Sequence, residues 1–161
     1  MSQPHTYKGI YLKFRNGGGL VEDVLYQNIT MQSAEQFAIW IGPAQQSDSD
    51  NLCAAHPCSI CWPILPGAQC NAPYNGQYRN ITLRDVTVNG ATNSPGLILA
   101  NTTAPMEDIL FDNVVVTGAG KWPFGTGYKC EGVASGVATG TTSPVPSCFT
   151  DKTTRTLAAA A

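Results

Sequence analysis

Four cysteines lie close together in the middle of the sequence, at Cys53, Cys58, Cys61 and Cys70. Cys53-x4-Cys58-x2-Cys61 matches the start of the plant-type iron–sulfur spacing, and the Cys58/Cys61 pair has the spacing with which many zinc sites begin. A fourth iron ligand should lie further downstream than Cys70, and zinc lacks a second pair of ligands, with His56 as the only spare one. We therefore predict two loop disulfides, with a cysteine-ligated metal module as the alternative. Four cysteines allow three pairings, which the sequence leaves open.

Two further cysteines, Cys130 and Cys148, lie in a stretch rich in Gly, Ser, Thr and Pro that begins at Gly118. We predict a disulfide between them, which would fasten an irregular C-terminal region onto the last strands. Six cysteines in 161 residues indicate an oxidising compartment. The segment Met1–His5 has neither the basic start nor the apolar core of a signal peptide, so secretion would require that the natural N-terminus lies elsewhere.

Adjacent carboxylates occur twice, as Glu22-Asp23 and Glu107-Asp108, and such pairs can act as general acid and base. Both pairs directly precede predicted strands, so hydrogen bonding at a bend of the chain explains them more simply than catalysis. Trp40 alternates with two isoleucines. We expect its ring to face outward, where it would be available to a sugar.

The charge balance excludes several classes of partner. Nine Lys and Arg against eleven Asp and Glu give a net charge of −2, which does not supply the positive field that nucleic acid or an anionic membrane requires. The longest apolar runs, at 37–41 and 114–116, are far below the ~20 residues of a membrane span. Charged residues make up only 12% of a chain with 16 Gly and 11 Pro, which is typical of turn-rich β structure.

Three eleven-residue segments align without gaps, and they predict how the chain positions its side chains. They are Val21–Met31, Tyr78–Val88 and Met106–Val116. In each copy the fourth, sixth, ninth and eleventh residues are apolar, which is the alternation of two short strands with one extra residue at a bend. Stacked copies would form four apolar ladders: Val24, Ile81 and Ile109; Tyr26, Leu83 and Phe111; Ile29, Val86 and Val114; Met31, Val88 and Val116.

The third and eighth places of each copy are occupied by Asn or Asp. They are Asp23, Asn80 and Asp108 at the third place, and Asn28, Asp85 and Asn113 at the eighth. These residue types tolerate left-handed backbone angles and hydrogen-bond to the nearby main chain. We therefore expect a sharp corner at both places.

Short strands that recur at a fixed spacing predict an all-β fold, a right-handed parallel β-helix of about three coils. A β-sandwich is the alternative, but it gives no reason for corner residues to repeat in register. The coils should occupy residues 1–117, interrupted by a Cys- and Pro-rich insertion at 44–76. A disulfide-stapled C-terminal cap should follow at 118–150, and 151–161 should be a disordered tail.

Several segments carry a resemblance to a known family. Gly9-Ile10-Tyr11-Leu12-Lys13 and Gly17–Val24, together with Asn28–Met31, resemble the C-terminal half of the polygalacturonase-type pectin hydrolases of glycoside hydrolase family 28. Arg79–Thr82 and Pro144–Phe149 are similar too, so the resemblance covers residues 9 to about 150. It implies a β-helix that acts on pectin in a secretory or cell-wall setting.

The resemblance also implies which residues contact the substrate. The family's Arg-x-Lys motif reads Tyr11-Leu12-Lys13 here, so Lys13 would bind a galacturonate carboxylate. Strand alternation puts Tyr11, Lys13 and Arg15 on one face, where Arg15 would replace the missing arginine or Tyr11 would stack on a sugar ring. The alternative is that Lys13 and Arg15 are ordinary solvated charges.

The family's catalytic motifs, Asn-Thr-Asp, an Asp pair and Gly-His-Gly, do not occur in this sequence. No catalytic residue, cofactor or metal is therefore predicted. We expect the C-terminal portion of a pectin hydrolase that contributes substrate contacts, is truncated at its N-terminal end and is inactive alone. The alternative is a non-catalytic pectin-binding or cell-wall solenoid.

Two further expectations concern the surface of such a fold. An open N-terminal coil edge would favour self-association or dependence on missing coils. Asn101, in an Asn-Thr-Thr sequon after a predicted strand, is the best candidate for glycosylation if the chain is secreted.

Overall fold

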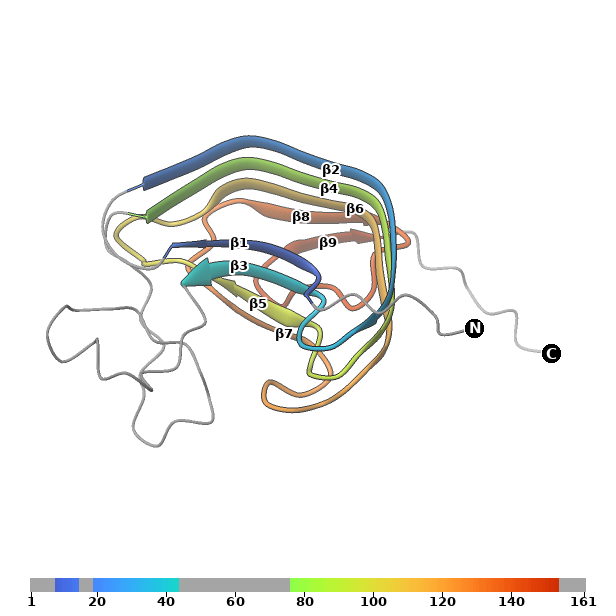
Figure 1. The fold of residues 1–161 in the computed structure, drawn as a ribbon. Helices are drawn as coiled ribbons and strands as arrows, with labels where there is room; N and C mark the ends of the chain where they lie inside the picture. Colours follow the sequence, from blue (N-terminus) through green and yellow to red (C-terminus); the bar gives the residue numbers. More distant parts are fainter. Residues whose placement is uncertain (1–7, 15–18, 44–75, 154–161) are drawn as a thin grey trace, which may run out of the picture.

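In a computed structural model, residues 8–14, 19–43 and 76–153 form an all-β protein with two parallel sheets. The four-stranded sheet has the order β1 (Ile10–Phe14), β3 (Ile39–Pro43), β5 (Gly96–Leu99) and β7 (Tyr128–Glu131). The five-stranded sheet has the order β2 (Gly19–Ala34), β4 (Gly76–Ala91), β6 (Glu107–Ala119), β8 (Gly136–Gly140) and β9 (Thr150–Thr153). The chain passes from one sheet to the other with each strand up to β8 (Figure 1). The predicted all-β class is confirmed.

The four predicted apolar ladders are confirmed by the strand register. Val24 pairs with Ile81, which pairs with Ile109, and the other three ladders follow in the same alignment. On β4 and β6 these side chains are buried, with Ile81, Leu83 and Phe111 fully so. Their burial is what holds the long strands in register, since a slip of one residue would turn the apolar set toward solvent.

The six predicted corner residues all have left-handed backbone angles. Asp23, Asn28, Asn80, Asp85, Asp108 and Asn113 have φ between 49° and 56°. At these corners β2, β4 and β6 bend together, so that the strands wrap around one side of the molecule in parallel (Figure 1). The eleven-residue repeat therefore corresponds to three aligned strands with two corners each.

Two features of this sheet lie outside the predicted repeat. A third corner follows in the aligned positions Ser33 and Gly90, which have φ of 51° and 81°. β8 adds a fourth strand beside β6, with Gly140 (φ 62°) at the level of Asn113. A Cβ at Gly140 would come within 2.0 Å of the Asn113 side-chain oxygen, which is why a glycine occupies this corner.

The main core lies between the sheets and is lined by the inward residues of both. It includes Ile10, Ile39 and Ile98 from the four-stranded sheet, and Ile81 and Phe111 from the five-stranded one. A second buried cluster, formed by Phe37, Trp40, Leu97 and Leu99, packs with Tyr11 and Phe124. Adjacent residues of β3 and β5 thus enter different clusters, so both faces of the four-stranded sheet are covered there.

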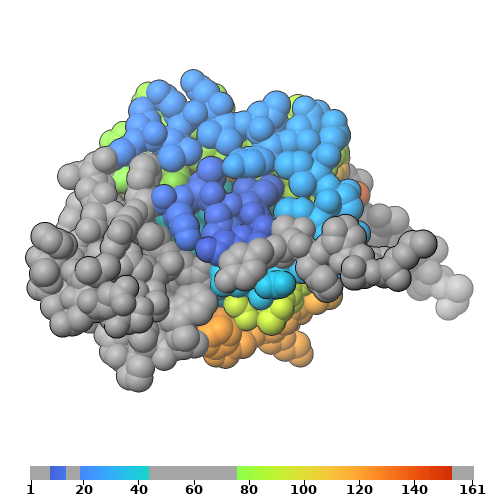
Figure 2. Space-filling view, viewed as in Figure 1, coloured from blue at the N-terminus to red at the C-terminus, as the bar shows by residue number. Residues whose placement is uncertain are grey.

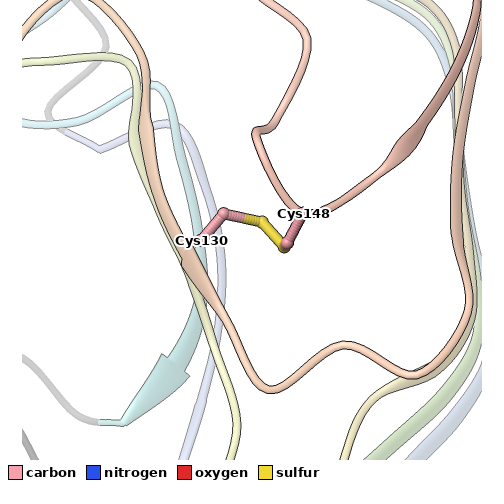
Figure 3. The surroundings of a disulfide bond; sticks show 2 residues. All are labelled: Cys130 and Cys148. Atoms are coloured by element: carbon pink, nitrogen blue, oxygen red, sulfur yellow. A yellow bond between two sulfur atoms is a disulfide. The ribbon is translucent and has the colours of Figure 1, made fainter.

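The C-terminal region is more regular than the irregular cap that was expected at 118–150, because it supplies β7 and β8 to the two sheets. The predicted disulfide between Cys130 on β7 and Cys148 is present, with a Cα–Cα distance of 5.5 Å (Figure 3). β9 includes the first three residues of the expected tail, Asp151 to Thr153, and pairs with β8. Along the stretches that the structure describes, no helix is long and apolar enough to cross a membrane.

Candidate functional site

β1 presents two of the predicted substrate-binding residues on one face. Ile10 and Leu12 point into the main core, whereas Tyr11 packs with the second cluster and Lys13 is exposed. The alternation expected for this strand is therefore present. Arg15, the third predicted residue, lies outside the described residues.

Tyr11 is held by contacts on several sides. Its hydroxyl accepts a hydrogen bond from the backbone N–H of Phe37 at 3.2 Å. Its ring is stacked on Trp40, with the centroids 6.0 Å apart and the planes at 27°. Because it is fixed in this way, Tyr11 can position the charged groups around it.

Two lysine ammonium groups lie near the Tyr11 ring. The Lys13 ammonium lies 5.4 Å from the ring centroid, and the Lys8 ammonium lies 5.6 Å from it. Both distances are in the range of cation–π attraction. Partial desolvation of the Lys13 ammonium, and after it the positive charge of Lys8, lower the pKa of Lys13. Two ammonium groups are thus held near one ring, an arrangement that can attract a carboxylate.

Sequence reasoning missed Lys8, which precedes the strand. Simple alternation counted back from Tyr11 would place residue 8 on the opposite face, together with Ile10 and Leu12. The residue lies two positions before the start of β1, at a bend, where that alternation does not apply. A signal was present only in the clustering of positive residues around Tyr11 in the sequence.

The expectation that Trp40 faces outward to solvent is wrong. Its side chain is fully buried and packs against Phe37 and Phe124, whose ring centroids lie 4.9 and 6.4 Å from that of Trp40. Its indole Nε1 donates to the carbonyl of Pro43 at 2.8 Å. Trp40 does point away from the main core, as alternation requires, but that side of the strand is covered, so the ring supports Tyr11 instead of serving as a sugar platform.

Another lysine, Lys129, lies on this face of the four-stranded sheet. Lys129 lies two strands beyond Trp40 in the same row, since Trp40 pairs with Leu97 and Leu97 pairs with Lys129. Its ammonium is 3.4 Å from a carboxylate oxygen of Glu131. Lys129 therefore has a carboxylate beside it, whereas Lys8 and Lys13 lie together near the Tyr11 ring.

The paired carboxylates belong to the corners, as expected. Asp23 accepts a hydrogen bond from Asn80 at 2.6 Å, and Asp108 accepts one from the Ser135 hydroxyl at 3.1 Å. Glu22 forms an ion pair with Arg79 on the neighbouring strand. These contacts stabilise the register of the five-stranded sheet, whereas Lys13 lies on the four-stranded one.

Other predicted sites are placed only in part. Cys53, Cys58, Cys61 and Cys70 lie outside the described residues, together with most of the expected insertion at 44–76. In the parts of the chain that are described, no group of three or more His, Cys, Asp and Glu side chains could hold a metal ion.

Asn101 is partly exposed, and its side-chain oxygen accepts hydrogen bonds from the N–H and hydroxyl of Thr103 at 2.9 and 2.7 Å. Its glycosylation stays a prediction.

Comparison of the chain with protein-family models, with curated proteins and with solved structures finds no match. Function is therefore inferred from the chemistry of the residues themselves. The strongest feature for that purpose is the pair of lysines around Tyr11, because it combines positive charge with a fixed aromatic ring.

Proposed function

We propose that this protein binds an acidic polysaccharide of the pectin type through Lys13 on β1 and Lys8, which precedes that strand. The observation that carries the proposal is the position of Lys8 and Lys13, with both ammonium groups within 5.6 Å of the Tyr11 ring centroid. Galacturonan carries one carboxylate on each unesterified sugar, so neighbouring cations match a repeating anion. A carboxylate beside them would favour the charged form of Lys13, whose pKa is lowered by desolvation and, after it, by the charge of Lys8.

The architecture proposed for this binding face is a right-handed parallel β-helix of about three coils. Its support comes from the chain's regular passage between two parallel sheets and from corners aligned strand by strand. Right-handed turns are expected because parallel crossover connections are almost always right-handed. On such a coil β1 would lie at the first exposed turn, with Lys13 on the outer surface.

We further propose that the chain corresponds to the C-terminal portion of a polygalacturonase-like hydrolase and contributes substrate contacts without the catalytic aspartates. An inverting glycosidase requires one carboxylic acid and one carboxylate about 6.5–9.5 Å apart across the scissile bond. The carboxylates of the described strands instead lie in corner and ion-pair contacts such as Asp23–Asn80 and Glu22–Arg79. Binding without cleavage is the expected behaviour of these 161 residues.

The second candidate is a non-catalytic cell-wall solenoid whose complete natural form also binds without cleaving. The same lysine pair favours it, since binding needs no acid–base pair. The two candidates differ in the natural full-length product, which releases reducing ends from polygalacturonate only if it is a hydrolase.

Binding is tested by titrating the protein with polygalacturonate at low salt. We expect Lys13→Ala and Lys8→Ala each to weaken binding by about threefold or more, and added salt to weaken wild-type binding by screening. Lys152→Ala, on β9 at the other end of the five-stranded sheet, is the matched control and should bind as wild type. Fully methyl-esterified pectin should not compete. Equal binding by Lys13→Ala and wild type would refute the proposed site.

A further inference from the structure

The five-stranded sheet ends, among the described residues, at β2, whose inward side chains are less buried than those of β4. Val24 and Ile29 of β2 are partly exposed, whereas their partners Ile81 and Val86 are fully buried. In Figure 2 the atoms of β1 and β2 occupy the face turned toward the viewer. A row of backbone groups with a partly exposed apolar side is a surface to which another strand can be added.

One row of charged residues across this sheet alternates in sign from strand to strand. Glu22 on β2 is paired with Arg79 on β4, and Arg79 is paired with Glu107 on β6. The Arg79 guanidinium donates to Glu22 at 2.6 Å. The sequence of charges across the three strands is therefore negative, positive, negative, so that no like charges stand side by side.

The corners repeat this alternation with acids and amides. At the first corner Asp23 accepts from Asn80, and the next residue in that row is Asp108. At the second corner the row begins with Asn28, continues with Asp85, and ends at Asn113, which donates to Asp85 at 2.9 Å. A carboxylate is thus followed by an amide, and an amide by a carboxylate.

We infer that the outer edge of β2, which pairs with no other strand among the described residues, is an interaction surface for one further parallel strand of the β4 type. Continuing the alternation outward places a basic residue over Glu22, an amide donor over Asp23 and a carboxylate over Asn28. β4 has that combination in Arg79, Asn80 and Asp85. The strand's inward residues would complete the burial of the apolar side of β2.

The occupant that this pattern specifies is a strand of a separate protein that carries the basic, amide and acidic residues of β4 at the same places. The sequence holds three copies of the eleven-residue repeat, and all three are already paired in this sheet. A second copy of the chain that added its own β2 in parallel register would place Glu22 beside Glu22 and Asp23 beside Asp23. Like charges directly opposite one another destabilise a strand pair, so charge complementarity disfavours that occupant.

The test uses the whole protein and two labelled peptides. The first has the β4 sequence, Gly76 to Ala91, and the second carries the changes Arg79→Glu, Asn80→Asp and Asp85→Asn with the same apolar residues. We expect the first peptide to bind at least about tenfold more tightly, because three complementary pairs act together. Equal binding of the two peptides would show that the edge binds apolar strands without selecting for their charged and amide residues, and would overturn the inference. No binding of the first peptide would overturn it as well.

A double-mutant cycle assigns the register. The protein variant Asn28→Asp should bind the β4 peptide several-fold more weakly than wild type does, and the peptide change Asp85→Asn should restore its binding.

A photo-crosslinking group at the Val88 position of the peptide distinguishes edge addition from displacement of β4. Crosslinks to Met31 alone support addition, whereas crosslinks to Val116 of β6 would contradict it, since Val88 natively pairs with both residues. A dimer of the protein alone with β2 crosslinked to β2 would also overturn the inference, by identifying a second copy as the occupant.

Discussion

The Asn80 side chain donates from Nδ2 to Oδ1 of Asp23 at 2.6 Å, across two strands that are 57 residues apart in sequence. Both residues have left-handed backbone angles, with φ of 49° and 56°. One pair of side chains therefore does two things: each residue permits its own corner, and the hydrogen bond aligns the two corners. Because most residue types disfavour this conformation, the corners are the positions where substitutions should be most informative.

Replacing Asn80 with alanine should destabilise the fold by about 2–3 kcal/mol. The change removes the hydrogen bond to Asp23 and places a Cβ in a conformation that costs roughly 1–2 kcal/mol for a residue without a compensating contact. Asn80→Gly is the matched control, since glycine adopts the same backbone angle without strain and loses only the hydrogen bond. Urea unfolding measures both variants. If Asn80→Gly were as damaging as Asn80→Ala, the backbone angle would not be the cause.

Tyr128→Phe should stabilise the protein by about 1 kcal/mol. The Tyr128 side chain is 6% exposed and its hydroxyl has no hydrogen-bond partner among the described residues. A buried polar group without a partner costs free energy, and phenylalanine keeps the edge contact with Phe111. A lower free energy of unfolding for the variant, measured at pH 8, would contradict this expectation.

The same tyrosine should make stability fall at alkaline pH. Burial raises the pKa of Tyr128 well above its ordinary value of 10.0. Above pH 10 the unfolded chain loses this proton while the folded protein keeps it, so the contribution to stability is complete below pH 10 and is lost as the pH rises. Between pH 8 and pH 10.5 the free energy of unfolding should therefore decrease less in Tyr128→Phe than in wild type. Parallel pH profiles would show that this phenol does not contribute.

Loss of the Cys130–Cys148 disulfide should lower stability by about 3 kcal/mol. The bond joins residues 18 positions apart and so restricts a short loop of the unfolded chain. The double variant Cys130→Ala, Cys148→Ala should unfold at a lower urea concentration than oxidised wild type. Peptide mapping of the wild type should recover Cys130 and Cys148 in one linked fragment. An unchanged unfolding midpoint would mean that the C-terminal region is held by its strand pairing alone.

As the pH is raised, binding of polygalacturonate should begin to weaken at a lower pH than it would at a site with an ordinary lysine. Lys13 must be protonated to attract a carboxylate, and its pKa is lowered by partial desolvation and then by Lys8. Binding should therefore be present below the lowered pKa and decrease as the pH rises through it. In Lys8→Ala the second cause is removed, so binding is weaker at neutral pH but should persist to higher pH. Binding measured over a pH series at constant salt, with Lys152→Ala as control, tests both effects. If binding by Lys8→Ala decreased at the same pH as binding by wild type, Lys8 would not be a cause of the lowered Lys13 pKa.

The sequence by itself determined the features that depend on local backbone chemistry. Asn and Asp at fixed places specified the corners, because few other residues accept a left-handed backbone, and the apolar alternation between them specified the four ladders. The pairing of Cys130 with Cys148 followed from their isolation in one stretch of the chain. These signals are local or periodic, so they can be recognised before any tertiary contact is known.

Tertiary structure alone decided which faces are covered. Alternation separated Trp40 from its isoleucine neighbours, but it could not say that Phe37 and Phe124 bury the Trp40 side of the strand as well. Likewise, Lys8 lies near the Tyr11 ring together with Lys13 because the chain bends before β1. β8 pairs with the five-stranded sheet although its sequence shares only a corner, at Gly140, with the eleven-residue repeat. Burial and charge clustering depend on groups brought together from distant parts of the chain, and no spacing within one segment encodes them.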